Sequence, residues 1–301
     1  MATQRDMDFT YSLIDRIFRL SIGERGDFSG AKFDGDFSMT LEEGQRRKHE
    51  FVAEQLGVQP GMRILDMGCG WGPLMTYLNS LGATTVGVTL SQKQAAACRK
   101  HGLDVHLLDC KTITRDTFGP FDAVASLGAF EHFCSVDEHK AGRQEEVYTR
   151  VFENVHGLLP PGGRFFLQTM VFGPNMIPYE EPDVNAPHLS DAHVLGLLGK
   201  TFPGSWLPYG AEQVEKTASP HFELVHKHSG RLDYIETIRR WRERFAAPSL
   251  KKWVLKLTLA PRYFFSRDFR LAFASGISAN TICFERLLLD HYRLVFERRE
   301  A

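Results

Sequence analysis

A glycine-rich turn directly after a short apolar run is the feature of this sequence that most restricts its fold. Residues 64–74 read ILDMGCGWGPL, with glycines at Gly68, Gly70 and Gly72. Glycines between a strand and a helix let the backbone approach a ligand closely, and the N-terminus of the helix favours negative charge. The pattern predicts a nucleotide site at the end of a strand in an α/β sheet.

An acid inside this turn bears on which nucleotide is bound. Asp66 lies two residues before Gly68. A carboxylate at this place repels the pyrophosphate that a G-x-G-x-x-G turn usually holds, and it suits the cationic end of S-adenosylmethionine (SAM). The glycine pattern alone leaves both ligands open.

Short β-rich runs alternate with helical stretches from residue 62 onward. Such alternation predicts a parallel, doubly wound sheet that binds its ligands at the carboxyl ends of the strands. The expected strands are 63–67, 84–90, 105–110, 121–127 and 164–171, and the expected helices between them are 71–81, 91–101 and 145–159.

The segments on either side of this core have a different character. An amphipathic helix is expected at 9–20 and another at about 41–57. Residues 172–210 contain six prolines and a short helix near 190–200. These segments are expected to close over the ligand crevice as a lid. Helices near 231–245 and 266–288 and a last strand at 292–297 complete the expected elements.

Composition excludes several classes of protein. The formal net charge is −1, so no overall field recruits nucleic acid. The five cysteines have no metal-ligand spacing and are expected to be small buried residues in a reducing cytosol. The N-terminus MATQRDMDF lacks the apolar core of a signal peptide, and no apolar stretch is long enough to span a bilayer. A cytoplasmic location is therefore expected.

Motifs along nearly the whole chain resemble the cyclopropane fatty acid synthase and mycolic acid cyclopropane synthase family of SAM-dependent methyltransferases. The stretches that carry the resemblance are MTLEEGQ (39–45), MRILDMGCGWGPL (62–74), VGVTLSQKQ (86–94), SLGAFEHF (126–133), PPGGRFFLQT (160–169), FPGSWLP (202–208), RLDYIETIRRWRERF (231–245) and VFER (295–298).

The resemblance implies the class I SAM-dependent methyltransferase fold within a single domain, 1–301. This fold is Rossmann-like, with a seven-stranded, mostly parallel sheet, an N-terminal helical cap and a helical lid insertion. The expected parts are the cap at 1–57, the SAM-binding core at 58–171, the lid on the substrate side at 172–221, and the remaining sheet and substrate-side helices at 222–301.

The resemblance also implies the cofactor site. Ser29, next to Phe28, is expected to close over SAM from the N-terminal side. Thr89 and Gln94 are expected on the ribose side, and Asp109 by the adenine. The residues expected around the methionine end are Asp66, Gly68, Gly70, Trp71 and Gly72.

The acceptor side is expected to hold the catalytic groups. Glu131 and Tyr234 fall on active-site positions of the family, and His132 forms a Glu-His pair like the one that N-methylating relatives use as a base. The residues expected in the substrate pocket are Phe28, Gln168, Met170 and Trp206.

Three of these positions depart from the ring-forming members of the family. Those members hold a bicarbonate base with a loop Cys, the Glu, a His and an Ile on the fifth strand, and the Tyr. In this sequence Gly30, Gln168 and Met170 replace the Cys, the His and the Ile. We therefore expect no bicarbonate, and Glu131 becomes the candidate base.

The leading functional hypothesis is C-methylation of an alkene carbon in an isoprenoid diphosphate or a lipid, with Glu131 stabilising the carbocation and removing a proton. One alternative is a cyclopropane synthase that acts on unsaturated acyl chains. Another is a small-amine N-methyltransferase that uses Glu131 and His132. A cofactor-binding module without turnover is the non-enzymatic alternative.

The expected partners follow from this hypothesis. A diphosphate would need cations, for which Lys32, Arg231, Arg239 and Arg240 are candidates, and Glu180, Glu181 and Asp183 would hold an accompanying Mg²⁺. The tract KKWVLKLTLAPRYFF (251–265) mixes lysines with apolar residues, and we expect a packed helix there with at most peripheral membrane contact. A homo-oligomer is left open.

Overall fold

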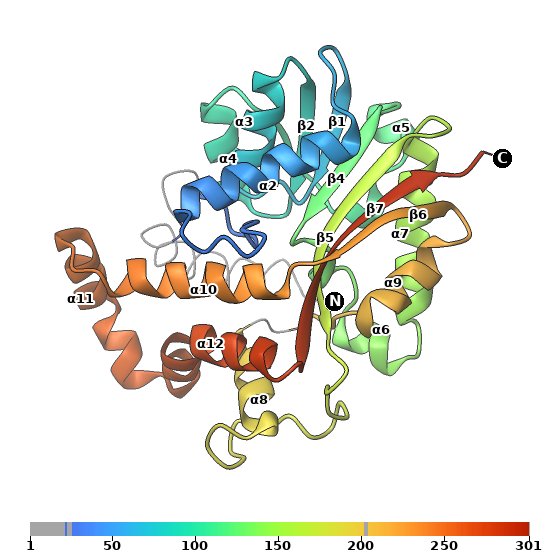
Figure 1. The fold of residues 1–301 in the computed structure, drawn as a ribbon. Helices are drawn as coiled ribbons and strands as arrows, with labels where there is room; N and C mark the ends of the chain where they lie inside the picture. Colours follow the sequence, from blue (N-terminus) through green and yellow to red (C-terminus); the bar gives the residue numbers. More distant parts are fainter. Residues whose placement is uncertain (1–21, 23–25, 202–203, 301) are drawn as a thin grey trace.

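The computed structural model describes residues 22, 26–201 and 204–300, so the helix expected at 9–20 lies outside the described residues (Figure 1). One seven-stranded sheet crosses the described part of the chain in the order β3-β2-β1-β4-β5-β7-β6. Strand β7 is antiparallel to both of its neighbours, and the other ladders are parallel. The expected doubly wound, mostly parallel sheet is confirmed. The strands are β1 (Arg63–Met67), β2 (Thr84–Thr89), β3 (Asp104–Leu107), β4 (Ala123–Leu127), β5 (Arg164–Phe172), β6 (Phe222–Ser229) and β7 (Leu289–Arg298).

Four of the helices form a group on one side of this sheet. Figure 1 shows α8, α10, α11 and α12 together at the lower left of the view, with α11 at the end farthest from the strands. Helix α12 packs against α8, α10 and α11. The helices are α2 (Leu41–Leu56), α3 (Pro73–Ser80), α4 (Gln92–Lys100), α5 (Arg115–Phe118), α6 (Val136–Lys140), α7 (Gln144–Leu158), α8 (Asp191–Thr201), α9 (Gly210–Ala218), α10 (Arg231–Ala246), α11 (Leu250–Phe265) and α12 (Arg267–Glu285), with short 3₁₀ turns η1 (Cys110–Thr112) and η2 (Phe130–His132).

Local sequence signals explain where several elements begin and end. The Ser91 side chain caps α4 by accepting a hydrogen bond from Gln94 N–H. Helix α3 begins at Pro73 rather than at residue 71 because Gly72 has a φ of 75°. Strand β3 ends at Leu107 rather than at residue 110 because Asp109 caps the turn η1. The edge strand β6 was not predicted, since its apolar residues Phe222, Leu224 and Val225 all lie in its first half and no alternation continues through HKHS.

An aromatic cluster closes one face of the sheet. The Phe152 ring of α7 contacts the rings of Phe165, Phe222 and Phe296 from three strands. All four side chains are buried. This packing fills the space between α7 and the sheet, and the two cavities described below lie at the carboxyl ends of the strands.

Candidate active site

One cavity lies at the carboxyl ends of β1, β2 and β4, around the glycine turn. Its lining includes Asp66, Gly68 and Gly70. Gly68 has a φ of 86°, and a Cβ there would lie 2.2 Å from the Cβ of Ala129, so a larger residue does not fit. A Cβ on Gly70 would meet nothing within 4 Å, which means that the backbone there is open to a ligand.

Most residues predicted to bind the cofactor meet in this cavity. Two do not line it: Gly72 is the N-cap of α3, and Asp109 Oδ1 accepts a hydrogen bond from Lys111 N–H at 2.9 Å. Their cofactor roles stay predictions. The predicted residues that do line the cavity are Phe28, Ser29, Asp66, Gly68, Gly70, Trp71, Thr89 and Gln94.

The Thr89 and Gln94 side chains are joined to each other at the rim of the cavity. Thr89 Oγ1 donates a hydrogen bond to Gln94 Oε1 at 2.7 Å. The same hydroxyl oxygen accepts a hydrogen bond from Ser91 N–H at 3.2 Å. The end of β2 and the start of α4 are thereby held together, and both residues line the cavity.

A buried ion pair beside this cavity was missed by sequence reasoning. The Asp27 carboxylate accepts hydrogen bonds from Lys48 Nζ at 2.7 Å and lies 2.8 Å from His49 Nε2. Burial alone would raise the pKa of Asp27, but Lys48 and His49 hold it well below its usual range. Asp27 and Lys48 come from segments 21 residues apart, so no local pattern identifies the pair.

The Asp66 carboxylate faces the same cavity. Burial, and then the nearby Asp27 charge, raise the pKa of Asp66 to about 7. Because Lys48 already balances Asp27, Asp66 is available for a ligand cation. The sulfonium and α-amino groups of SAM supply such a cation, so the residues present fit this cofactor.

A second cavity of about 440 Å³ adjoins the first on the acceptor side. Its size is that of an ordinary small-molecule site. The lid segment contributes Met176 and Tyr179, and α8 contributes Leu195 and Leu198. Of the predicted pocket residues, Met170 and Trp206 line this cavity, whereas Phe28 lines the cofactor cavity.

Glu131 is the buried carboxylate of the acceptor cavity. It lies in η2, directly after β4, and its Oε1 accepts a hydrogen bond from Met170 N–H at 2.8 Å. Its Oε2 has no hydrogen-bond partner among the described residues. Burial raises the pKa of Glu131 to about 7, which is the range of a general base at neutral pH.

His132 lines both cavities and therefore marks the place where they meet. Its Nδ1 lies 2.8 Å from Ser205 Oγ. Burial lowers the pKa of His132 to about 4, so the ring is neutral at physiological pH. A methyl donor in one cavity and an acceptor in the other would meet beside Glu131 and His132.

The structure places Tyr234 away from the lining of both cavities. Its ring stacks on His291 with centroids 4.8 Å apart, and it is buried. A Cβ on Gly30 would lie 2.4 Å from Tyr234 Cδ2. The ring thus occupies the space that a side chain at position 30 would need, and the catalytic role of Tyr234 stays a prediction.

Gln168 is held in a buried network rather than in the lining of the acceptor cavity. Its Nε2 donates a hydrogen bond to the Gly30 carbonyl at 3.1 Å, and its Oε1 accepts one from Arg293 Nε at 3.1 Å. Arg293, which is fully buried on β7, also donates hydrogen bonds to Asp233 Oδ2 at 2.9 Å and to the Ala31 carbonyl at 2.6 Å. Sequence reasoning missed Arg293. This network fixes the loop around Gly30 to β5, β7 and α10.

The candidate diphosphate-binding cations have other partners. Lys32 pairs with Asp34, and Arg239 and Arg240 both pair with Glu236. Arg231 Nη1 donates a hydrogen bond to the Phe284 carbonyl at 3.1 Å.

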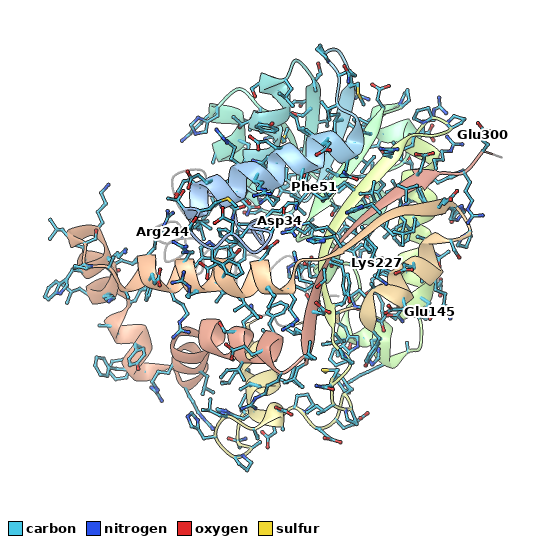
Figure 2. The ribbon with its side chains drawn as sticks, viewed as in Figure 1. Asp34, Phe51, Glu145, Lys227, Arg244 and Glu300 are labelled. Atoms are coloured by element: carbon cyan, nitrogen blue, oxygen red, sulfur yellow. The ribbon has the colours of Figure 1, made fainter. Side chains whose placement is uncertain are left out.

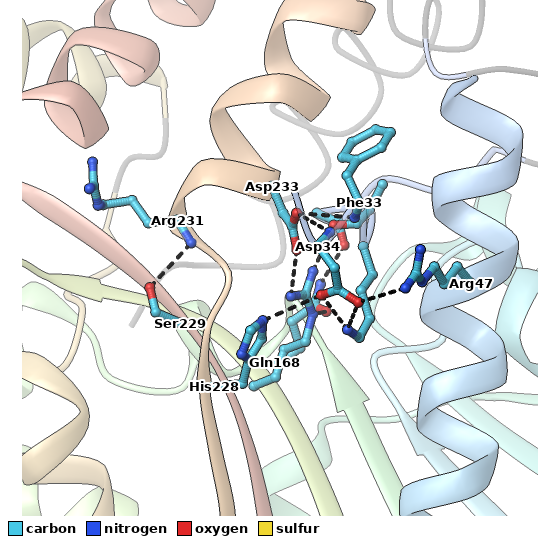
Figure 3. A network of polar contacts seen from close by, with 12 residues as sticks. Phe33, Asp34, Arg47, Gln168, His228, Ser229, Arg231 and Asp233 are labelled. Atoms are coloured by element: carbon cyan, nitrogen blue, oxygen red, sulfur yellow. Dashed lines mark hydrogen bonds and ion pairs between the residues drawn. The ribbon is translucent and has the colours of Figure 1, made fainter. Parts of the chain in front are cut away.

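The candidate magnesium ligands do not form a group. Glu180 lines the acceptor cavity, but Glu181 and Asp183 are exposed and do not line it. Among the described residues, the only group with metal-ligand geometry is Asp34, His228 and Asp233. Figure 3 shows that Asp34 faces Arg47, and the oxygens of both aspartates are engaged by basic side chains or backbone N–H groups. This arrangement is that of an ion-pair network.

The fold and the paired cavities define a class I SAM-dependent methyltransferase, whose cofactor is SAM. The chain belongs to the mycolic acid cyclopropane synthetase family, whose model matches residues 2–257. It is 31% identical to cyclopropane mycolic acid synthase 3 of Mycobacterium tuberculosis over 77% of this chain and 78% of that protein. It is 32% identical to the cyclopropane-fatty-acyl-phospholipid synthase of Escherichia coli over 86% of this chain and 59% of that protein. The solved structure of the cyclopropane synthase MmaA2 from Mycobacterium tuberculosis superposes with a TM-score of 0.76 at 26% identity, over 98% of both chains.

These relatives shift the expected substrate away from isoprenoids. The geranyl diphosphate C-methyltransferase of Streptomyces coelicolor is only 13% identical, with a TM-score of 0.58 over 93% of this chain and 89% of that one, and it shares the fold alone. The cyclopropane synthase alternative is better supported than the leading hypothesis of C-methylation of an isoprenoid or a lipid. No helix among the described residues is long and apolar enough to cross a membrane.

Proposed function

We propose that this protein transfers the methyl group of SAM to a double bond in a lipid acyl chain and closes a cyclopropane ring there. The observation that carries the proposal is the meeting of the two cavities at His132, which brings an apolar acceptor site to a cofactor site beside a buried carboxylate. The curated relatives that act on acyl lipids support the acyl substrate.

The chemistry assigns two tasks to Glu131. SAM, when bound, supplies a methyl group that is already activated on its sulfonium sulfur. The alkene would take this methyl as the methyl–sulfur bond breaks and S-adenosylhomocysteine leaves, and the neighbouring carbon of the acyl chain would then carry the positive charge. The Glu131 carboxylate stabilises that cation through Oε2 and then takes a proton from the new methyl, whose C–H electron pair closes the ring.

The other residues orient and protect this step. The Met170 N–H holds Glu131 through Oε1, so Oε2 is kept in a fixed direction. The apolar walls from α8 and the lid exclude water, which would otherwise add to the cation. Neutral His132 adds no positive charge beside the cation.

The contacts around Gly30 favour a different product of the same methyl transfer. Tyr234 fills the space beside Gly30, and Gln168 is engaged by Gly30 and Arg293. These contacts support the expectation that no bicarbonate is held there. Glu131 would then remove a proton from the substrate chain instead of from the new methyl, and the product would be a methyl-branched alkene.

Trideuteromethyl SAM distinguishes these products. The purified protein would be incubated with it and with unsaturated phospholipids, prenyl diphosphates or aryl-ethylamines, and the products read by mass spectrometry. Two deuteriums retained on an acyl chain support ring closure, and three support the methyl-branched alkene. Label on a prenyl chain or on an amine alone would contradict the lipid proposal.

A further inference from the structure

Helix α11 carries its apolar residues on the outside. Leu250, Trp253, Val254, Leu257, Phe264 and Phe265 recur at helical spacing and form one stripe, here called the α11 stripe. Leu250 is 81% exposed, Trp253 65% and Phe265 91%. The expected helix is present and packs on α12, but it turns this stripe outward, whereas an amphipathic helix normally turns its apolar stripe toward the core.

A specific contact holds the helix in this rotation. Lys252, on the opposite face, is nearly fully buried, and its Nζ donates hydrogen bonds to the carbonyls of Arg244 and Ala247 at the end of α10. Leu259, seven residues further on, is buried on the same inner face. Arg244, which is labelled in Figure 2, is in turn paired with Glu42 of α2. The α11 stripe is therefore directed outward by a lysine that satisfies the end of the preceding helix.

The charges of α11 indicate what the stripe contacts. The helix sequence contains three lysines and one arginine, and no acidic residue. Lys251 and Lys256 are exposed on either side of the stripe. An apolar stripe flanked by lysines fits a bilayer with anionic headgroups, because the stripe enters the acyl boundary while the ammonium groups remain at the phosphates. In a two-fold contact between copies, the same lysines would face each other.

The position of α11 agrees with the substrate class. Helix α11 packs on α12, which packs on α8, and Leu195 and Leu198 of α8 line the acceptor cavity. We propose that the α11 stripe is a membrane-docking surface, which binds anionic lipid bilayers and holds the acceptor cavity near the acyl chains. The proposal extends the lipid proposal, but bilayer binding is measured independently of any reaction.

The test is cosedimentation of the full chain with saturated vesicles of phosphatidylglycerol and, separately, phosphatidylcholine. Saturated chains offer no double bond, so the result does not depend on the proposed reaction. We expect Trp253→Ser/Leu257→Ser to weaken binding by about tenfold or more. Lys251→Glu/Lys256→Glu should remove the preference for phosphatidylglycerol, by about tenfold. The matched control is Val225→Ser/Leu232→Ser, which changes exposed apolar residues on β6 and α10 and should bind as the wild type does.

Three results would overturn the proposal. One is the absence of binding to phosphatidylglycerol vesicles by the wild type, and another is equal loss of binding in the control variant. The third is a dimer, seen by sedimentation velocity without lipid, that Trp253→Ser/Leu257→Ser splits while vesicle binding is absent; a second copy would then cover the stripe. Circular dichroism of each variant checks that it is folded.

Discussion

The cofactor cavity and the acceptor cavity of this protein are assembled over different distances in the sequence. The cofactor cavity takes the largest part of its lining from 66–94, which includes the glycine turn, Thr89 and Gln94, and smaller parts from 26–29 and 127–132. The acceptor cavity and its supports come from η2, β5, the lid, α8 and β7. Residues close together in the sequence are positioned largely by their own turn. The position of Glu131, in contrast, depends on a hydrogen bond from the backbone of a distant strand, and its pKa depends on burial. We therefore expect losses on the cofactor side to reduce affinity, and losses on the acceptor side to reduce rate or stability.

The largest effect is expected from Glu131→Gln. Loss of the base should lower kcat by about 10²- to 10⁴-fold while the Kd for SAM stays unchanged. Because burial raises the pKa of Glu131 to about 7 and the carboxylate form is active, the wild-type rate should rise with pH through 7, and the variant should lack that rise. Kinetics from pH 6 to 8 and calorimetric SAM titration measure both. Glu180→Gln, in the same cavity, is the control and should change kcat little; an equal loss there would contradict the assignment.

Arg293→Met should have its main effect on stability. It leaves the buried Asp233 carboxylate without its cation, which should lower the free energy of unfolding by about 3–5 kcal/mol in urea titration. Arg293→Met/Asp233→Asn removes the uncompensated charge and should recover part of the loss. Arg150→Met, which breaks an exposed pair with Glu146, is the control and should cost less than about 1 kcal/mol. Similar losses in both single variants would argue against the buried network.

Asp66→Asn should weaken SAM binding by about 10- to 100-fold through loss of a charge-assisted contact, without changing the fold. A pKa of about 7 means that Asp66 is protonated below pH 7 and ionised above it. The wild-type Kd should therefore fall from pH 6 to 8, and that of the variant should stay flat. Asp116→Asn, an exposed change on α5, is the control for calorimetric titration. A variant that keeps the wild-type pH dependence would show that another group carries the charge.

The smallest effect is expected from Thr89→Val, which removes hydrogen bonds to Gln94 and Ser91. The Kd for SAM should rise by about three- to tenfold, with kcat unchanged at saturating SAM. Thr84→Val, at the exposed start of the same strand, should leave the Kd as it is. A large fall in kcat for Thr89→Val would contradict the assignment of affinity to the cofactor cavity and of rate to the acceptor cavity.

The structural features that depend on local geometry were predicted correctly from residues near one another in the sequence. Strand β1 has the expected bounds, and α4 begins and ends within one residue of the expected helix. The turn at Gly68 and Gly70 lies where the sequence predicts a ligand. Backbone conformation, helix capping and strand patterning act over a few residues, which is why one sequence was sufficient for them.

Other features were decided only by tertiary structure. Gln168 was expected in the substrate pocket, yet it is bound by Arg293, which lies 125 residues away. Asp27 needs Lys48 and His49 before its charge can be assigned. The amphipathic pattern of 250–265 specifies a helix with two faces but not which face is buried, and the contact of Lys252 with the end of α10 decides that. The sequence by itself determined the sheet, the cofactor turn and the family, because these depend on local conformation and spacing. Which charges are paired, which cavities adjoin and which surface remains exposed depend on burial between distant segments, and only the folded chain sets that.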